Sequence, residues 1–220
     1  MQDAPRRPAR LRSGIAPGVY VHYFARMVKK KLAFVFGVFC ATVLLMAVQK
    51  PVFLAYYAAD AAQASAGEWL GVVWHGLTLD STVAGYVTAL PLLLTLASLW
   101  VRLPERIWRR VLNVYFVLIA VLTAAIFAVD LNLYGYWGFR LDGSVLIYLS
   151  DPGEALASAS WGEVLRQILI MLVYAGAMIW SYRWILRLFR VEPVPLRGRI
   201  VPTVAALLIG GLTFLAIRGG

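Results

Sequence analysis

The sequence predicts an all-α, polytopic membrane protein with five transmembrane helices, and both its composition and its segment lengths indicate this class. Of the 220 residues, 61% are hydrophobic and only 15% are charged, which lies outside the range of soluble globular domains. Five apolar segments each approach the roughly 20 residues that a helix needs to cross about 30 Å of hydrocarbon. They are Leu32–Val48, Val83–Val101, Val111–Val129, Val164–Trp180 and Ile200–Ile217. We therefore expect a five-helix transmembrane domain over residues 32–217.

The loops between these segments alternate between arginine-rich and carboxylate-rich, and this alternation predicts the orientation of the chain. All but four of the 21 basic residues lie in residues 1–31, 102–110 and 183–199. Cytoplasmic loops carry an excess of Lys and Arg, so these three regions are expected on the cytoplasmic side. The N-terminus, in a basic cytoplasmic arm of residues 1–31, is then cytoplasmic, and after five spans the C-terminus is extracytoplasmic.

The net charge of +10 does not indicate nucleic-acid binding, because the basic residues follow the sidedness of the loops instead of forming one patch. Contact with anionic phospholipid headgroups explains this charge, and membrane lipid is the expected partner. Cys40 is the only cysteine, and the two histidines, His22 and His75, are expected on opposite sides of the membrane. The sequence therefore predicts neither a disulfide framework nor a shared histidine metal site.

Three local sequence signals refine the first two predicted spans. The aromatic residues at 53–57 suit the belt at a membrane surface, so the first span is expected to extend past Pro51. The triplet Asp-Ser-Thr at 80–82 is typical of a helix start, and the second span is expected to begin there. Pro91 then lies in mid-span, where we expect it to kink the helix.

One pattern, Gly-x-x-Leu-Asp-x-Ser/Thr-Val-x-x-Tyr, occurs twice, at residues 76–86 and 138–148. Both copies fall on the predicted extracytoplasmic face. One interpretation is that both are helix starts at a membrane surface, where a capping Asp and an interfacial Tyr are expected. The other is that Asp80 and Asp142 line one outward-facing polar site together with Arg140. The residues alone leave both interpretations open.

No phosphate-binding glycine loop, zinc signature, nucleophile elbow or kinase motif occurs in the sequence. The predicted spans also lack a chain of ionisable groups, which argues against an ion or proton conduit. A transporter would instead show ion-coupled uptake that is lost on substitution of Asp130 or Asp142.

Four stretches carry a resemblance to a known family: residues 74–86 before the second span, 130–142 after the third, 149–158 and 217–220. The run Trp-Gly-Phe-Arg-Leu-Asp at 137–142 is the most specific of them. Together they resemble the lipoteichoic acid synthase family of sulfatase-like phosphoglycerol transferases. The resemblance implies a multi-pass protein of the bacterial cell (inner) membrane whose helices carry an extracytoplasmic domain of the alkaline-phosphatase superfamily.

The resemblance also implies an activity for the parent protein. The extracytoplasmic domain would bind a divalent metal, typically manganese, and use a threonine nucleophile to move glycerol phosphate from a phosphatidylglycerol-like lipid to an acceptor. That domain would follow residues 218–220, the expected start of its linker. No catalytic residue and no cofactor is therefore assigned to this chain, which would anchor the enzyme and position the lipid headgroup.

The headgroup site is expected in the loops on the extracytoplasmic side. An arginine would bind the phosphate, carboxylates would orient the arginine or accept glycerol hydroxyls, and aromatic rings would set the depth in the headgroup layer. The candidate residues are Arg140, Asp142, Asp80, Tyr134, Trp137 and Trp74.

Two alternatives accompany this hypothesis. Arg140 is equally well explained as one partner of a salt bridge to Asp142 or Asp130. The whole chain is also explained as a stand-alone five-helix scaffold or lipid-binding protein without catalysis.

The anchor hypothesis predicts the size of the native protein. An antibody against residues 1–18 is expected to detect a membrane protein far larger than the 24.4 kDa of this chain, because a transferase domain would add several hundred residues. A band at 24.4 kDa would instead support the self-contained scaffold.

Overall fold

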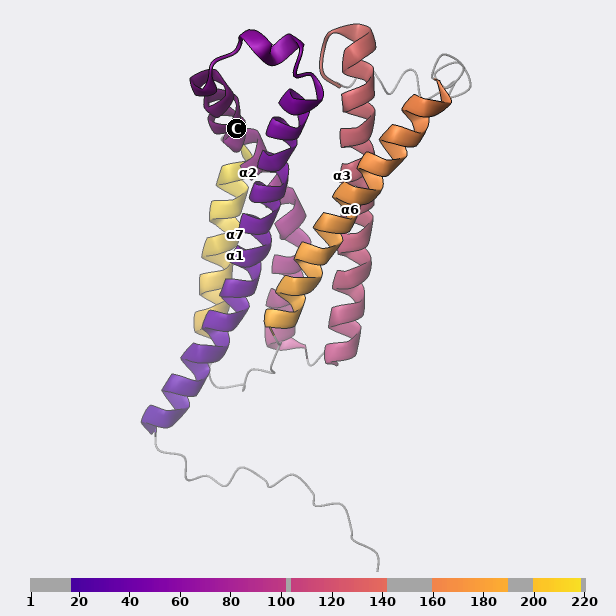
Figure 1. Ribbon diagram of the computed structural model, residues 1–220. Coiled ribbons are helices and arrows are strands. Elements are labelled where there is room, and N and C mark those ends of the chain that lie inside the picture. Colours follow the sequence, from indigo (N-terminus) through magenta and orange to yellow (C-terminus); the bar gives the residue numbers. More distant parts are fainter. Residues whose placement is uncertain (1–16, 102–103, 142–159, 190–199, 219–220) are drawn as a thin grey trace, which may run out of the picture.

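The computed structural model describes residues 17–101, 104–141, 160–189 and 200–218, whose arrangement is shown in Figure 1. Within these ranges the chain forms five long helices and one short 3₁₀ helix, and no strand. They are α1 (Pro17–Tyr56), η1 (Asp60–Gln63), α2 (Ala66–Trp100), α3 (Glu105–Trp137), α6 (Trp161–Leu188) and α7 (Ile200–Arg218). The predicted all-α fold is confirmed for the described part of the chain.

Four of these helices are long and apolar enough to cross a membrane: Val28–Tyr56 of α1, and the whole of α2, α3 and α6. α7 contributes a shorter apolar stretch, Pro202–Leu215. Large apolar side chains such as Leu44, Leu118 and Val173 are each more than half exposed on the outside of the bundle. So much exposed apolar surface fits lipid and not water. The chain is thus a helical, multi-pass membrane protein, and the fifth span stays a prediction.

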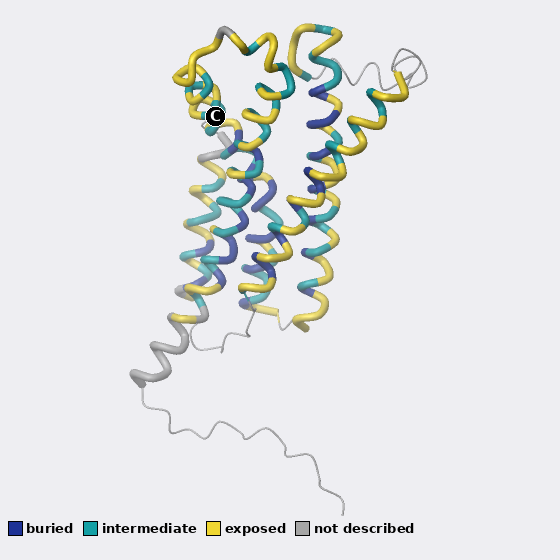
Figure 2. The backbone as a smooth tube through the Cα atoms, viewed as in Figure 1, coloured by how far each residue is buried: buried dark blue, intermediate teal, exposed yellow. Residues whose placement is uncertain are grey.

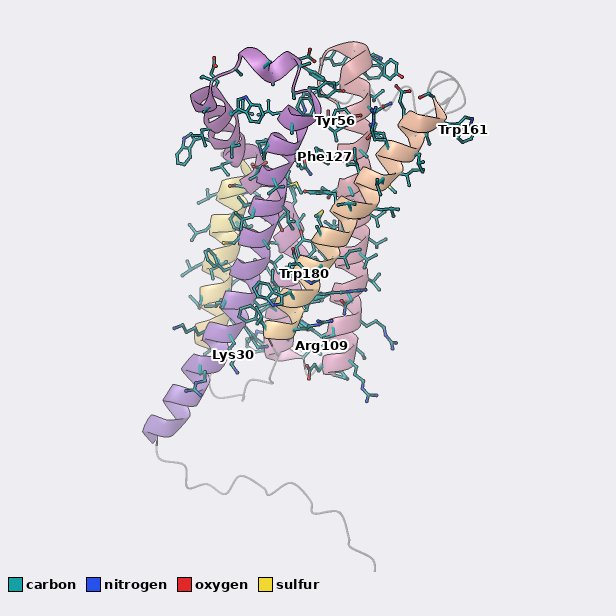
Figure 3. The ribbon with its side chains drawn as sticks, in the orientation of Figure 1. Lys30, Tyr56, Arg109, Phe127, Trp161 and Trp180 are labelled. Atoms are coloured by element: carbon teal, nitrogen blue, oxygen red, sulfur yellow. The ribbon has the colours of Figure 1, made fainter. Side chains whose placement is uncertain are left out.

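Successive helices run in opposite directions, which gives the bundle two ends of different character (Figures 1 and 3). The upper end holds Tyr56 and Trp161, and the lower end holds Lys30 and Arg109. α3 begins and α6 ends at the lower end, so basic residues from distant parts of the sequence gather there. Those on α3 and α6 are Arg106, Arg109, Arg110, Arg183 and Arg187. Which side of a membrane the lower end faces stays a prediction.

The helices pack as two groups that meet along α1. In one group α2 packs against both α1 and α7, and in the other α3 packs against α6. We call the boundary between these groups the seam. Near the lower end, Phe34 of α1 and Trp108 of α3 meet across it with ring centroids 5.2 Å apart. Figure 2 shows that the buried residues line the facing sides of the helices.

Hydrogen bonds also cross the seam, and two tyrosines of α6 take part in several of them. The Tyr182 hydroxyl lies 3.0 Å from Oγ1 of Thr42, and Nε2 of Gln49 donates to the Tyr174 hydroxyl at 2.9 Å. Tyr174 in turn donates to the backbone carbonyl of Leu45 at 2.8 Å. Polar groups surrounded by hydrocarbon need partners within the protein. These bonds therefore fix α1 against α6 in one rotational setting.

The start of α2 differs from the sequence prediction. α2 begins at Ala66, so the helix start predicted at residues 80–82 is wrong. The actual start is a capping box, in which the Ser65 hydroxyl accepts a hydrogen bond from the Glu68 backbone N–H and the Glu68 carboxylate accepts one from the Ser65 backbone N–H. Asp80 lies well inside the helix, where it is buried.

Two prolines of these helices bear on the predicted boundaries, one at the start of α1 and one in the middle of α2. α1 begins at Pro17, a residue that suits the first position of a helix, so residues 17–31 of the predicted arm belong to this helix. α2 continues as a helix through Pro91, which is buried among its neighbours.

Two lysines of α1 fix this helix to α2 at two levels. Nζ of Lys31 donates to Oγ of Ser98 at 2.5 Å near the lower end. Nζ of Lys50 lies 2.6 Å from both carboxylate oxygens of Asp80 near the upper end. The two lysines are 19 residues apart in the sequence, which corresponds to a helical rise of about 28 Å. This rise is close to the thickness of the hydrocarbon layer, about 30 Å, so the two contacts mark its expected boundaries.

A glycine makes the upper contact possible. Lys50 passes directly over Gly76 on its way to Asp80, one helical turn further along α2. A Cβ atom on Gly76 would lie 1.8 Å from Cε of Lys50, far too close for two atoms that are not bonded, so the end of the lysine side chain would have to move. The absence of a side chain at this position therefore lets the buried lysine reach its carboxylate.

We expect Gly76→Ala to destabilise the protein by about 2–4 kcal/mol, measured by denaturant unfolding in micelles. The new methyl group displaces Lys50, and a buried charge without its partner costs about 3–5 kcal/mol, which the better helix propensity of Ala offsets by about 1 kcal/mol. The matched control is Gly71→Ala in the same helix, since a Cβ atom there meets nothing within 4 Å. Equal effects of the two substitutions would contradict this role of Gly76.

Candidate functional site

Aromatic rings gather at the upper end, where α1 meets α3. Tyr134 of α3 has its ring centroid 4.8 Å from that of Phe53 on α1 and 4.9 Å from that of Tyr57, the residue that follows α1. Tyr56 lies beside Tyr57, with centroids 5.0 Å apart. We call these four residues the upper aromatic cluster. Edge-to-face pairs of this kind hold ring positions firmly, so the cluster provides a rigid base for polar groups above it.

Tyr57 ties the cluster to the backbone of α3. Its hydroxyl donates a hydrogen bond to the carbonyl oxygen of Leu131. Burial, to which the neighbouring Tyr56 adds, raises the pKa of the Tyr57 phenol above its usual value. The phenol therefore keeps the proton that it donates.

Arg140 lies above this cluster and is held by Asp130. Its guanidinium carbon is 4.6 Å from the centroid of the Phe53 ring, a cation–π arrangement. Nη2 of Arg140 lies 2.5 Å from Oδ2 of Asp130, and the Leu141 backbone N–H donates to Oδ1 of the same carboxylate at 2.7 Å. α3 ends at Gly138 in the left-handed conformation (φ 70°), which turns the chain back toward Asp130.

The Arg140 side chain combines a fixed position with access from outside. It is 53% exposed, whereas the Asp130 side chain is only 6% exposed. The buried carboxylate therefore engages part of the guanidinium, and the rest of its donor face remains accessible.

Arg166 on the first turns of α6 holds a related position. Its guanidinium carbon lies 5.0 Å from the centroid of the Tyr56 ring. The next residue, Gln167, donates from Nε2 to the Tyr56 hydroxyl at 2.9 Å. A capping box fixes the start of α6, because the Ser160 hydroxyl accepts from the Glu163 backbone N–H and the Glu163 side chain accepts from that of Ser160. Within the described ranges, no carboxylate lies at ion-pair distance from Arg166.

The two arginines are placed in the same way, each over an aromatic ring of α1. Phe53 and Tyr56 are successive aromatic residues on one side of α1, and each carries a guanidinium over its ring. The arginines come from the other helix group, Arg140 from just beyond α3 and Arg166 from α6. Planar guanidinium groups donate paired hydrogen bonds that match the oxygens of a phosphate. The upper end therefore presents two phosphate-compatible cations on an aromatic base.

The structure brings together some of the residues that the sequence analysis singled out. Arg140 and Tyr134 belong to the site, and Trp137 lies nearby at the end of α3, where it stacks on Phe139 at 5.5 Å between centroids. The salt bridge from Arg140 to Asp130, one of the two considered, is present.

The remaining candidates lie elsewhere. Asp80 is paired with Lys50 between α1 and α2, so the structure does not place it against Arg140. Trp74 lies on the first half of α2 and is 73% exposed. Asp142 lies outside the described residues.

Sequence reasoning missed two groups that complete the arrangement. Arg166 and Gln167 are not among the candidates taken from the sequence, although two adjacent polar side chains in an apolar helix are a signal for an interhelical partner. Lys50 also indicates an interhelical partner. It follows an uncharged stretch of α1, so its ammonium group needs an acidic partner within the bundle.

No group of three or more His, Cys, Asp or Glu side chains is placed to hold a metal ion within the described ranges. Fold and site together define a class, a helical multi-pass membrane protein with a cationic, aromatic-based site at one end. Comparison with protein-family models, curated proteins and solved structures finds no match for this chain. The resemblance to the lipoteichoic acid synthase family therefore stays a hypothesis.

Asp130→Leu is expected to release both Arg140 and the chain that follows α3. Loss of the carboxylate removes the hydrogen bond to the Leu141 N–H, so amide hydrogen exchange at residues 139–141 should accelerate severalfold. Asp60→Asn, which changes an exposed acid at the same end, is the control and should leave this exchange unchanged. Unaltered exchange in Asp130→Leu would show that Asp130 does not hold this turn.

Proposed function

We propose that the chain is a membrane domain that binds the phosphate of an anionic phospholipid headgroup at its upper end. The observation that carries this proposal is the pair of guanidinium groups, Arg140 and Arg166, set over the rings of Phe53 and Tyr56, which are three residues apart on α1. A phosphate placed between them would receive charge-assisted hydrogen bonds from both.

The position of the site supports a lipid as the source of that phosphate. Lys50 lies one turn before Phe53 on α1, at the expected boundary of the hydrocarbon layer. The two arginines therefore lie at the depth of the headgroups. Tyr134 and Trp137 are residue types that favour this layer. A lipid in the upper leaflet would present its phosphate to the site without leaving the membrane.

The orientation is part of the proposal. With the arginine-rich lower end on the cytoplasmic side, the upper end and its site face the extracytoplasmic side of a bacterial cell membrane. Anionic lipids of the opposite leaflet would contact the basic residues at the lower end.

The resemblance to the phosphoglycerol transferases supplies a use for such a site. A bound donor lipid would be held close to a tethered active site, which raises the local concentration of the reacting headgroup. In this proposal the divalent metal, with manganese the expected ion, and the threonine nucleophile belong to a domain beyond this chain. The residues of this chain bind and orient the lipid and transfer nothing themselves.

A lipid-binding scaffold without catalysis would use the same site. The size of the native protein separates the two possibilities, whereas the headgroup site is common to both.

We expect the double variant Arg140→Gln/Arg166→Gln to lose most of its retention of phosphatidylglycerol. The test is native mass spectrometry of the protein released from micelles that contain phosphatidylglycerol, with phosphatidylcholine as the neutral comparison. Each guanidinium–phosphate contact is worth about 1.5–3 kcal/mol, so each single variant should weaken binding about tenfold or more. Arg183→Gln at the lower end is the comparison for loss of charge; it should reduce retention far less, because several other basic residues at that end remain to contact anionic lipid. Equal retention by the double variant and by this control would contradict the proposal.

A further inference from the structure

Lys31, at the lower end of the bundle, is a buried cation that has no counter-charge in the described part of the chain. Only 5% of the residue is exposed, and its Nζ donates one hydrogen bond, to Oγ of Ser98. Lys50 on the same helix differs, because its Nζ lies against both carboxylate oxygens of Asp80. An ammonium group can donate three hydrogen bonds. Two donor positions of Lys31 therefore have no acceptor within the described ranges.

The acidic residues of the described chain do not supply this charge. Five of the six lie toward the upper end, and the sixth, Glu105 at the start of α3, forms an ion pair with Arg109 at 2.8 Å. Lys30 and Arg109 lie at this same lower end, where cations predominate (Figure 3). A buried charge without a counter-charge is strongly destabilising, so we expect an anion to accompany Lys31. The six described acids are Asp60, Glu68, Asp80, Glu105, Asp130 and Glu163.

A second polar group without a partner lies beside Lys31 on α2. The Ser98 hydroxyl that accepts from Lys31 donates in turn to the backbone carbonyl of Thr95 at 2.6 Å. Oγ1 of Thr95 is itself buried and has no hydrogen-bond partner within the described ranges. Other threonines of the bundle, such as Thr42 and Thr213, donate to the carbonyl four residues earlier. The Thr95 hydroxyl instead remains free to bond a ligand.

A third such group, the indole N–H of Trp108, comes from α3. Trp108 is only 2% exposed, and its Nε1 also has no partner among the described residues. Its ring lies 5.2 Å from that of Phe34, which follows Lys31 by three residues and so shares its side of α1. Three helices thus bring an ammonium group, a hydroxyl and an indole N–H to within about one helical turn of one another along the bundle.

We propose that Lys31, Thr95 and Trp108 bind an anionic phosphate between α1, α2 and α3 at the lower end. A phosphate supplies both the missing negative charge and several acceptor oxygens, and lysine is a common phosphate ligand. Lys31 lies at the expected lower boundary of the hydrocarbon layer, the depth at which phospholipid phosphates begin. Basic pockets between transmembrane helices bind such headgroups. This site lies inside the bundle, apart from the exposed basic residues of the lower end and from the two arginines of the upper end.

The first test measures binding of short-chain phosphatidylglycerol to the whole chain in a neutral detergent, by isothermal titration calorimetry. The background is Arg140→Gln/Arg166→Gln, so that the upper site does not contribute. Lys31→Met should weaken binding about tenfold or more, and Trp108→Phe, which keeps a ring but loses the N–H, about fivefold. Lys29→Met, an exposed lysine two residues earlier, is the matched control and should change the affinity less than about twofold.

Inorganic phosphate, titrated in the same way, distinguishes the two sources of the ligand. Binding of phosphatidylglycerol alone assigns the site to a lipid, whereas binding of both assigns it to phosphate in either form. Binding of neither, or equal losses in Lys31→Met and Lys29→Met, would overturn the proposal.

A second measurement, thermal unfolding of the chain with its arginines intact, remains informative even if Lys31→Met folds poorly. In neutral detergent without phosphate or anionic lipid, Lys31→Met is expected to unfold at a higher temperature than the unsubstituted chain, because it removes a buried charge that lacks a partner. Added phosphatidylglycerol should raise the unfolding temperature of the unsubstituted chain more than that of Lys31→Met. If Lys31→Met is instead less stable without the lipid, or does not fold, the protein itself supplies the counter-charge and the proposal is wrong.

Discussion

A lysine inside an apolar helix needs a counter-charge within reach, and Asp80 of α2 supplies it to Lys50 of α1. Much of the upper half of the bundle depends on this requirement. It fixes the height of α2 against α1, it brings the Lys50 side chain across the bare backbone of Gly76, and it places the aromatic rings of α1 one turn above the ion pair. Removal of one partner would leave a charge in hydrocarbon, which costs far more than an exposed ion pair contributes.

The sequence was sufficient to predict the helical fold and four of the five predicted spans, because apolar length depends only on local composition. It was not sufficient to place the start of α2. Residues 65–68 and 80–82 both have the character of a helix start, and only the position of Lys50 on another helix shows that Asp80 is an ion-pair partner and not a cap.

Prediction of the candidate site was partial for a related reason. Arg140 and Tyr134 stand in a distinctive run of residues, and Asp130 was recognised as a possible partner. Arg166 and the rings of Phe53 and Tyr56 join them only because α1, α3 and α6 have particular rotations about their axes. Those rotations are set by contacts such as Thr42 with Tyr182, which no pattern within a single segment reveals.

The seam between the two helix groups gives the site an unusual construction. Both arginines belong to the α3/α6 group, and both rings beneath them belong to α1 of the other group. Each cation–π contact therefore joins the two halves of the protein, and neither half contains the site alone. The site is accordingly sensitive to sliding of one group along the other: a shift of one helical turn, about 5.4 Å, would exchange the ring beneath each guanidinium or leave it without one. The affinity of the site for a phosphate would therefore depend on how far the α3/α6 group has slid along α1.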